Sequence, residues 1–434
     1  MSTHQFDYGL SPGDFVEMMH HRGTQDVDGS DTRTVCAGCL RDDSGIAKAI
    51  GHFATSRQCD FCERRFRSER AAPIEDVARF VIGCLREDYD IPENVLFYDK
   101  DSDYGFAGHV MDKVELLEEN LPYDDWDVLD AIAKCITDDK MWCEANPGLF
   151  LPHRQLASSW ETFSRYVKHS SRYMFLRPDE QRRGYDGFDD NYIPARRMLD
   201  LLGEAVLAAD LVRTIGPRTR IFRARPVREG DVWYSTALEL GPPPSSETGP
   251  PAGRMNAAGI PVFYGALELE TCLSEALESN GRVSVGLFSP SRPLKVLDLA
   301  RAEPLPYRSI FEAVTPAMRG LPAFIEAFRD DIAKVTARDG REHIDYVPAQ
   351  IVTEYFRRVF VVEDGEGGEE RLHGILYPST RNPAGRNVAL FVSREEIKGT
   401  PFEDPVLRFH PRSTGRFLVT AGDDAVSSWE RVAS

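Results

Sequence analysis

The sequence predicts a multidomain protein: an N-terminal zinc-binding element, then an α-helical module, then a C-terminal α+β domain. Three observations support this fold class. Two C-x2-C pairs lie within residues 36–62, apolar residues recur at helical spacing between 72 and 214, and short β-branched runs alternate with helical segments from 219 onward. We therefore expect a four-cysteine element over 1–70, a helical module over 71–210, an α+β domain over 211–405 and a C-terminal tail over 406–434.

Size and charge limit the function. The 434 residues are enough for two or three domains, and the formal net charge is −18. Residues 1–210 carry about −16 of it and residues 211–434 about −2. Such a chain is a poor binder of phosphate backbones, so the sequence gives no strong signal for a nucleic-acid partner. The sequence has no apolar run of the ~18 residues that span a bilayer and no signal-peptide pattern, so we expect no membrane contact and a cytoplasmic location.

The first element is defined by its cysteines. Two C-x2-C pairs, separated by nineteen residues, have the spacing of a four-thiolate zinc site, with Cys36, Cys39, Cys59 and Cys62 as ligands. Disulfides are the competing interpretation, and a cytoplasmic chain disfavours them. We expect His52, between the pairs, to be a surface or packing residue. We expect core thiols at the remaining four cysteines, Cys84, Cys135, Cys143 and Cys272.

The apolar spacing in the middle of the chain predicts helices. The periodic segments are 72–88, 109–120, 125–138, 156–172 and a long one at 195–214, which we expect to join the two halves.

From residue 219 the pattern changes to mixed strands and helices. We expect strands at 219–226 and 260–264, two in 284–300 and two in 358–377, with helices at 268–277 and 346–356. A Pro/Gly/Ser-rich loop ends the segment 231–251 and precedes the next motif.

That motif is the stretch 253–275, around which the domain is organised. Arg254 lies on a Gly-containing turn, Tyr264 at the end of the expected strand, and Glu275 late in the expected helix, at spacings of ten and eleven residues. A turn, a strand and a helix in this order direct three different side chains toward one site.

These residues resemble the RES family, whose catalytic set is an Arg, a Tyr and a Glu at these spacings, followed later by a Ser. Here the Ser is Ser379 in GILYPSTRNPAGRNVALF, and Arg223 in IFRAR resembles the opening strand of the family. The resemblance covers roughly residues 211–405. It implies a fold akin to ADP-ribosyltransferases, breakdown of NAD, and a role as a toxin or defence effector. Such proteins are typically paired with a helix-turn-helix antitoxin.

The resemblance implies catalytic roles for Arg254, Tyr264, Glu275 and Ser379, and NAD-binding roles for Arg223, Arg254, Tyr264 and Ser379. Cleavage of nicotinamide from NAD passes through an oxocarbenium-like state, which a carboxylate such as Glu275 stabilises. An arginine fork suits the pyrophosphate, and a tyrosine stacks on a flat ring. The competing interpretations are a surface carboxylate, surface ion pairs, a core aromatic and a turn-capping serine.

Residues before this domain resemble the HEPN/RES N-terminal domain, including the segment SSWETFSRYVKHSSRY. Many HEPN proteins are ribonucleases with Arg, four to six residues, then His. Only three residues separate Arg165 from His169, so we expect a scaffold or sensor without ribonuclease chemistry. Because the chain carries this large module itself, the sequence leaves open whether regulation is in cis or by an antitoxin.

The ADP-ribose acceptor stays open. Water gives a glycohydrolase, phosphate a phosphorylase, and a macromolecule an ADP-ribosyltransferase. A catalytically inactive RES-like binding module is the alternative from another class. The chain lacks G-x-G-x-x-G and G-x4-G-K-[ST], which disfavours dehydrogenases and NTPases. The sequence also leaves open whether the chain forms homo-oligomers.

Overall fold

The chain divides into two compact units. The computed structural model describes residues 10–28, 31–41, 43–102, 104–137, 140–145, 152–172, 195–243, 249–276, 280–301, 308–314, 319–333, 342–363, 367–398, 405–421 and 426–432. The N-terminal unit comprises Met1–Ser159, Arg182–Ile193 and Pro306–Ala323; the C-terminal unit comprises Trp160–Gln181, Pro194–Leu305 and Phe324–Ser434. A central piece of the expected catalytic domain is thus grouped with the N-terminal unit.

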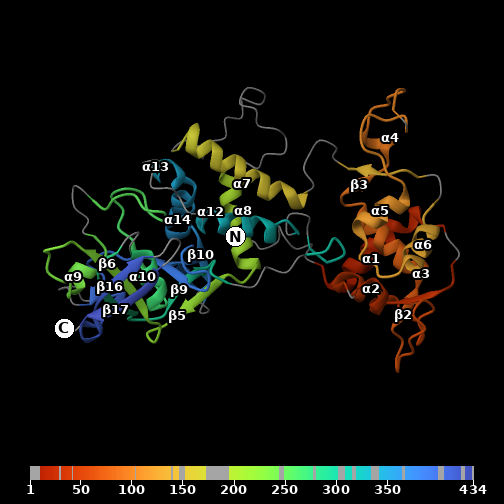
Figure 1. Cartoon of the computed structure of the whole chain (residues 1–434). Coiled ribbons are helices and arrows are strands. Elements are labelled where there is room, and N and C mark those ends of the chain that lie inside the picture. The colour runs from red at the N-terminus through yellow and green to blue at the C-terminus, as the bar shows by residue number, and fades with distance from the viewer. Residues whose placement is uncertain are drawn as a thin grey trace. The chain divides into compact units, whose positions relative to one another are not determined.

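The N-terminal unit is mainly helical (Figure 1). Its helices are α1 (Pro12–Gly23), α2 (Ser44–Phe53), α3 (Ile74–Leu85), α4 (Pro92–Val95), α5 (Lys113–Asn120) and α6 (Trp126–Cys135), with 3-10 turns at Thr24–Asp26 and Ala37–Leu40. Two short antiparallel ladders join β1 (Thr34–Cys36) to β2 (Ala71–Pro73) and β3 (Tyr89–Asp90) to β4 (Cys143–Glu144).

Helix α3 is the centre of this unit, and nine of its twelve residues are buried. Helix α1 lies directly against it through a pair of glycines. A Cβ on Gly23 would lie 1.9 Å from the carbonyl oxygen of Arg79, and a Cβ on Gly83 would lie 1.8 Å from that of Met19. Only glycine permits this backbone approach.

A hydrophobic core extends through the described residues of this unit. It includes the cysteine element, the faces of α1, α2, α3, α5 and α6, and Phe311 from the segment 308–314. The cluster continues across residue 70, where the sequence suggested a division. The ring of Phe311 lies 6.3 Å from that of Phe80, and its carbonyl oxygen fills the space where Gly45 lacks a side chain.

A buried ion pair fixes a second residue of the segment Pro306–Ala323, Arg319, in the N-terminal unit. The two terminal guanidinium nitrogens of Arg319 each donate to one carboxylate oxygen of Asp88 at 2.9 Å. Their side chains are only 5 % and 4 % exposed. Residues 308–314 and 319 therefore belong to the N-terminal core, although they lie between a strand and a helix of the other unit in sequence.

The C-terminal unit is built on a mixed sheet. In the described residues it has eleven strands, in the order β14-β15-β8-β6-β7-β13-β12-β9-β5, and β16 joins both β8 and β17. The strands are β5 (Val212–Ile215), β6 (Ile221–Val227), β7 (Phe263–Ala266), β8 (Gly281–Pro290), β9 (Leu294–Asp298), β12 (Gly374–Pro378), β13 (Arg386–Leu390), β14 (Ile397–Lys398), β15 (Leu407–Phe409), β16 (Gly415–Ala421) and β17 (Val426–Val432). A separate hairpin joins β10 (Val361–Glu363) to β11 (Glu369–Arg371).

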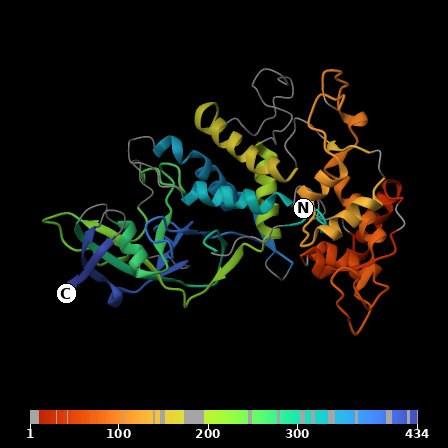
Figure 2. The same ribbon diagram turned by 45° about the vertical axis from the view of Figure 1, so that its right-hand side comes forward.

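Helices complete this unit: α8 (Ala195–Ala208), α9 (Ala237–Leu240), α10 (Leu269–Ala276), α12 (Leu321–Ala333), α13 (Glu342–Asp345) and α14 (Val347–Arg358), with a 3-10 turn at Pro411–Ser413. Helix α7 (Pro152–His169) divides between the two units, and the first three residues of α12 are grouped with the N-terminal unit. Helices α8, α12 and α14 lie side by side in both views (Figure 1, Figure 2). Helix α10 contacts β6, β7 and β13, and so covers the middle of the sheet.

The predicted helices and strands are largely present, with three differences. The helix expected over 195–214 ends at Ala208, because Asp210 has a positive φ of 50° and the β-branched run that follows pairs with β9 as β5. The strand expected at 260–264 begins later, at Phe263; Pro261 has no N–H for a ladder. Beyond residue 405, the residues assigned to a tail include three strands, and β16 pairs with β8 over five residues. Residues 244–248 of the Pro-rich loop and 364–366 of the acidic loop lie outside the described residues.

No helix in the described part of the chain has both the length and the apolar character needed to cross a membrane.

Candidate active site and four-cysteine centre

Arg254 lies on a tight turn held at both ends. The backbone N–H of Gly253 donates to the carbonyl of Asn256 at 2.9 Å, and the N–H of Asn256 donates back at 3.3 Å. A Cβ on Gly253 would lie 2.4 Å from Oδ1 of Asn256 and 2.8 Å from the hydroxyl of Tyr264. The turn therefore needs glycine at its first position, and its geometry fixes where the arginine side chain starts.

The hydroxyl of Tyr264, on β7, is committed to this turn. It donates to Oδ1 of Asn256 at 2.7 Å and accepts from the backbone N–H of Met255 at 2.9 Å. Burial raises the pKa of Tyr264 well above its usual value, so the group stays a neutral phenol. Its ring, rather than its hydroxyl, is left to contact a ligand.

Helix α14 supplies a further pair of hydrogen bonds to the turn of Arg254, which the sequence did not predict. Nε2 of Gln350 donates to the carbonyl oxygens of Gly253 and Asn256, at 2.8 and 2.9 Å. One side chain thus closes both ends of the turn. Gln350 lies within the expected helix, but the sequence gives no signal that this residue reaches a turn ninety-odd positions earlier.

The guanidinium of Arg254 has no carboxylate partner among the described residues. It donates to the carbonyl oxygen of Ile332, at the end of α12, and its carbon lies 5.9 Å from the centre of the Tyr346 ring. A half-buried cation satisfied only by a carbonyl and an aromatic ring keeps its charge available for an anion.

Arg223 lies where two strands separate. The ladder between β6 and β7 contains the single pair Phe222–Ala266, and beyond it the guanidinium of Arg223 donates to the carbonyl oxygen of Tyr264. Burial, with a smaller contribution from Arg225, lowers the pKa of Arg223 to about 9. Its Nε has no hydrogen-bond partner in the described chain. A second poorly compensated cation therefore contacts the strand that carries Tyr264.

Glu275, on α10, meets Ser379 directly. The serine hydroxyl donates to Oε1 of Glu275 at 2.7 Å. Nδ2 of Asn387, on β13, donates to the same oxygen at 2.8 Å. Sequence reasoning placed Asn387 inside a family-like stretch but gave it no role.

Further contacts, beyond those of Glu275 with Ser379 and Asn387, hold α10 against the turn that carries Ser379. Glu268 accepts from the backbone and guanidinium of Arg386 at 2.9 to 3.0 Å. Asn382 donates to the hydroxyl of Thr271 at 2.9 Å. The glutamate and the serine are therefore fixed relative to one another by two further side-chain links.

The structure brings the predicted residues Arg254, Tyr264, Glu275 and Ser379 into one region. Strand pairing links them: Asn387 of β13 donates to Glu275 and lies opposite Tyr377 of β12, and β13 pairs with β7, which carries Tyr264. Arg223 adjoins the group through Tyr264. Together they provide two cations, aromatic rings and a carboxylate, which is what recognition of a dinucleotide with a reactive glycosidic bond requires.

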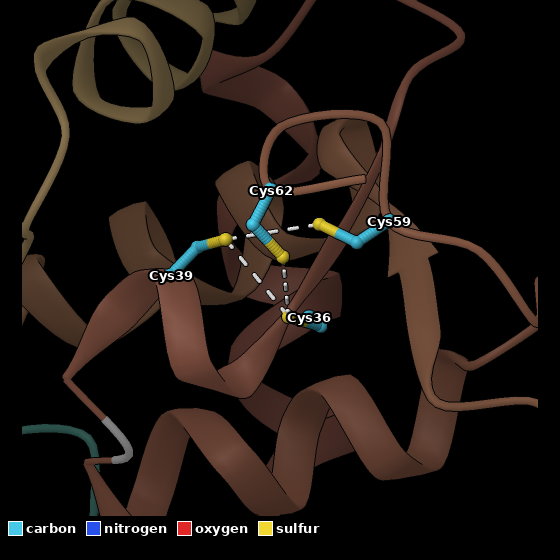
Figure 3. Close-up of side chains that lie close together, drawn as sticks. All are labelled: Cys36, Cys39, Cys59 and Cys62. Carbon is cyan, nitrogen blue, oxygen red and sulfur yellow. Dashed lines mark hydrogen bonds between the residues drawn. The ribbon is translucent and has the colours of Figure 1, made fainter. Parts of the chain in front are cut away.

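The four predicted metal ligands converge in the N-terminal unit (Figure 3). Their sulfur atoms all lie within 4.8 Å of one another, and three of the pairs, Cys36–Cys39, Cys36–Cys62 and Cys39–Cys59, are 3.7 to 3.9 Å apart. Four sulfurs at about 2.3 Å from a central zinc ion would lie about 3.8 Å apart in a tetrahedron. All four are free thiols, so the donor set fits one tetrahedral metal ion.

Burial raises the pKa of two of these thiols, Cys36 and Cys39, above the usual range. Burial, followed by the charge of Cys59, raises the pKa of Cys36 to about 11. His52 lies outside the set and approaches Glu17 at 3.3 Å. The other cysteines, Cys84, Cys135, Cys143 and Cys272, are buried, as the sequence predicts for core thiols.

Two family models match the chain. The model described as HEPN/RES N-terminal domain 1 matches residues 53–181, and the model described as RES domain matches residues 220–411. The first match begins between the two cysteine pairs, and the second contains every predicted catalytic residue. No curated protein and no solved structure matches the chain.

Proposed function

We propose that this protein cleaves the bond between nicotinamide and ribose in NAD. The chain carries a RES domain over residues 220–411, preceded by a HEPN/RES N-terminal domain. RES-domain membership is consistent with an enzyme that acts on NAD. The finer proposal is a glycohydrolase or phosphorylase with an ADP-ribosyltransferase-like fold, which acts as a toxin or defence effector.

The observation that carries the proposal is the fixed position of Glu275 beside Ser379 and Asn387, on the strand next to β7, whose Tyr264 holds the turn of Arg254. Departure of nicotinamide leaves positive charge on the ribose, so the transition state gains more from a nearby carboxylate than ground-state NAD does. The guanidinium of Arg254 would hold the pyrophosphate as a bidentate donor, exchanging its carbonyl partner for the anion.

The four-cysteine centre supports a structural role for zinc rather than a catalytic one. All four ligands are thiolate formers, and a catalytic zinc normally leaves a position for water. Three of the four cysteines are part of the core of the N-terminal unit, so bound zinc would contribute directly to its folding.

The test is to incubate the purified full-length protein with NAD, with and without phosphate, and to resolve the products by chromatography. Free ADP-ribose identifies water as the acceptor, and ADP-ribose 1″-phosphate identifies phosphate. At saturating NAD, Glu275→Gln should lower turnover by about 10²–10³, by analogy with loss of one transition-state contact.

Glu270→Gln is the matched control, because Glu270 is an exposed carboxylate on the same helix. It should turn over NAD at the wild-type rate. Equal rates for the Glu275→Gln and wild-type proteins would exclude Glu275 as the catalytic carboxylate, and the proposed reaction would lose its main support.

A further inference from the structure

The two hydrogen bonds to Glu275 are asymmetric. Both Ser379 and Asn387 donate to Oε1, and Oε2 accepts no hydrogen bond from the described residues. Glu275 itself is exposed, whereas Ser379 and Asn387 are each only 5 % exposed. An exposed helical glutamate ordinarily samples several rotamers, and here two buried donors restrict it to one.

The hydroxyl group of Ser379 donates its proton to Glu275. Its Oγ accepts from the backbone N–H groups of Arg381 and Asn382, at 3.2 and 3.1 Å, because these residues form the turn that follows it. The hydroxyl therefore has its acceptor sites occupied and donates its one proton to Glu275. In this arrangement Ser379 orients the carboxylate.

Asn387 is held more rigidly still. On the central strand β13 it lies opposite Ala266 of β7 and Tyr377 of β12. The next residue, Val388, belongs to the core cluster on the other face of the sheet, so alternation places Asn387 on the face covered by α10. A buried amide among apolar strand neighbours costs stability unless it is hydrogen-bonded. An aliphatic residue would serve packing better at this position.

We propose that Asn387 is a positioning residue: with Ser379 it fixes Glu275 through Oε1, so that Oε2 faces the ribose of the substrate. This inference rests on the proposed cleavage of NAD. It assigns Asn387 no contact with the substrate, so its whole effect on the reaction passes through Glu275.

A double-mutant cycle tests this dependence, since residues that act through one another have non-additive effects. In the wild-type background, Asn387→Ala should lower kcat about 10- to 100-fold, as is typical when a supporting hydrogen bond is lost, and leave the KM for NAD within about threefold. In the Glu275→Gln background the same change should lower kcat by less than about threefold. Release of radiolabelled nicotinamide during long incubations measures these slow rates.

Asn387→Leu guards against a folding defect, because leucine has a similar volume and suits the strand. It should unfold at the wild-type temperature and show the same loss of kcat. Val388→Ala is the control for a general disturbance of β13, since Val388 lies on the opposite face of the sheet. It should reduce stability but leave kcat near the wild-type value.

The outcomes separate the two proposals. If wild-type protein releases no nicotinamide from NAD, the proposed function fails and the role of Asn387 fails with it. If wild-type protein is active, but the Asn387 changes lower kcat by the same factor in both backgrounds or not at all, only the positioning role is overturned.

Discussion

Replacing Arg319 by methionine should destabilise the N-terminal unit by about 3–5 kcal/mol, the usual cost of removing one partner of a buried ion pair. The pair is bidentate at 2.9 Å, and both side chains are at most 5 % exposed, so Asp88 would keep a buried charge without a cation. Methionine preserves much of the apolar stem of arginine, so the loss reports the charge rather than the packing.

The measurement is amide hydrogen exchange of the full-length protein, followed in peptides from α3, whose residues are almost all buried. Since each 1.4 kcal/mol changes an equilibrium constant tenfold, exchange through unfolding should accelerate by about 10² to 4 × 10³. Lys134→Met is the control in the same unit: its partner Asp130 is one helical turn away, the two side chains are 67 % and 39 % exposed, and the expected cost is about 0.3–0.5 kcal/mol.

A second variant checks the cause. Combining Arg319→Met with Asp88→Leu removes both charges, and it should restore most of the lost protection, because apolar residues replace buried ion pairs at little cost. If α3 exchanges no faster in Arg319→Met than in Lys134→Met, then the buried pair does not anchor residue 319 in this unit.

Three further predictions follow from the structure. Freshly purified protein should contain one zinc ion per chain by elemental analysis, and Cys59→Ser should lose it and unfold the N-terminal unit; metal-free wild-type protein would refute this. Burial alone would raise the pKa of Asp26, but hydrogen bonds from Arg86 and Lys140 outweigh it and lower the pKa below 3.8. The resulting stabilisation is complete above pH 3.8 and is lost as pH falls through the lowered pKa of the folded state. The free energy of unfolding should therefore fall less steeply with decreasing pH in Asp26→Asn than in the wild type. The same pH dependence in both proteins would exclude this contribution. Gln350→Ala should raise the KM for NAD about tenfold with a smaller change in kcat, because it loosens the turn that carries Arg254, the proposed pyrophosphate ligand; steady-state kinetics with an unchanged KM would argue against that role.

The local patterns of the sequence predicted much of the site. The two C-x2-C pairs bring four sulfur atoms to metal-binding distances of one another. The two cysteines of each pair are held together by one short turn, so the fold has only to bring the two turns close to each other. The Arg254, Tyr264 and Glu275 motif gave a turn, a strand and a helix in the expected order, because all three lie within 22 residues and each element follows from local preferences. The family matches confirmed the suspected RES and HEPN/RES domains.

The partners of these residues were not predictable from local patterns. Asn387 meets Glu275 only because β13 lies beside β7 under α10, and Gln350 reaches the turn at Arg254 only because α14 packs nearby. Spacing along the chain carries no information about such contacts, since they depend on which strands pair and in which register.

By itself the sequence determined the elements and the residue types of both sites, because periodicity, cysteine spacing and turn chemistry act over a few residues. The tertiary structure alone decided three things: that Phe311 and Arg319 join the N-terminal core, that residues 415–419 extend the sheet beside β8, and that 212–215 form a strand where a helix was expected. In each case a partner far away in the sequence, whether an apolar core, a buried carboxylate or a neighbouring strand, outweighs the local preference of the segment.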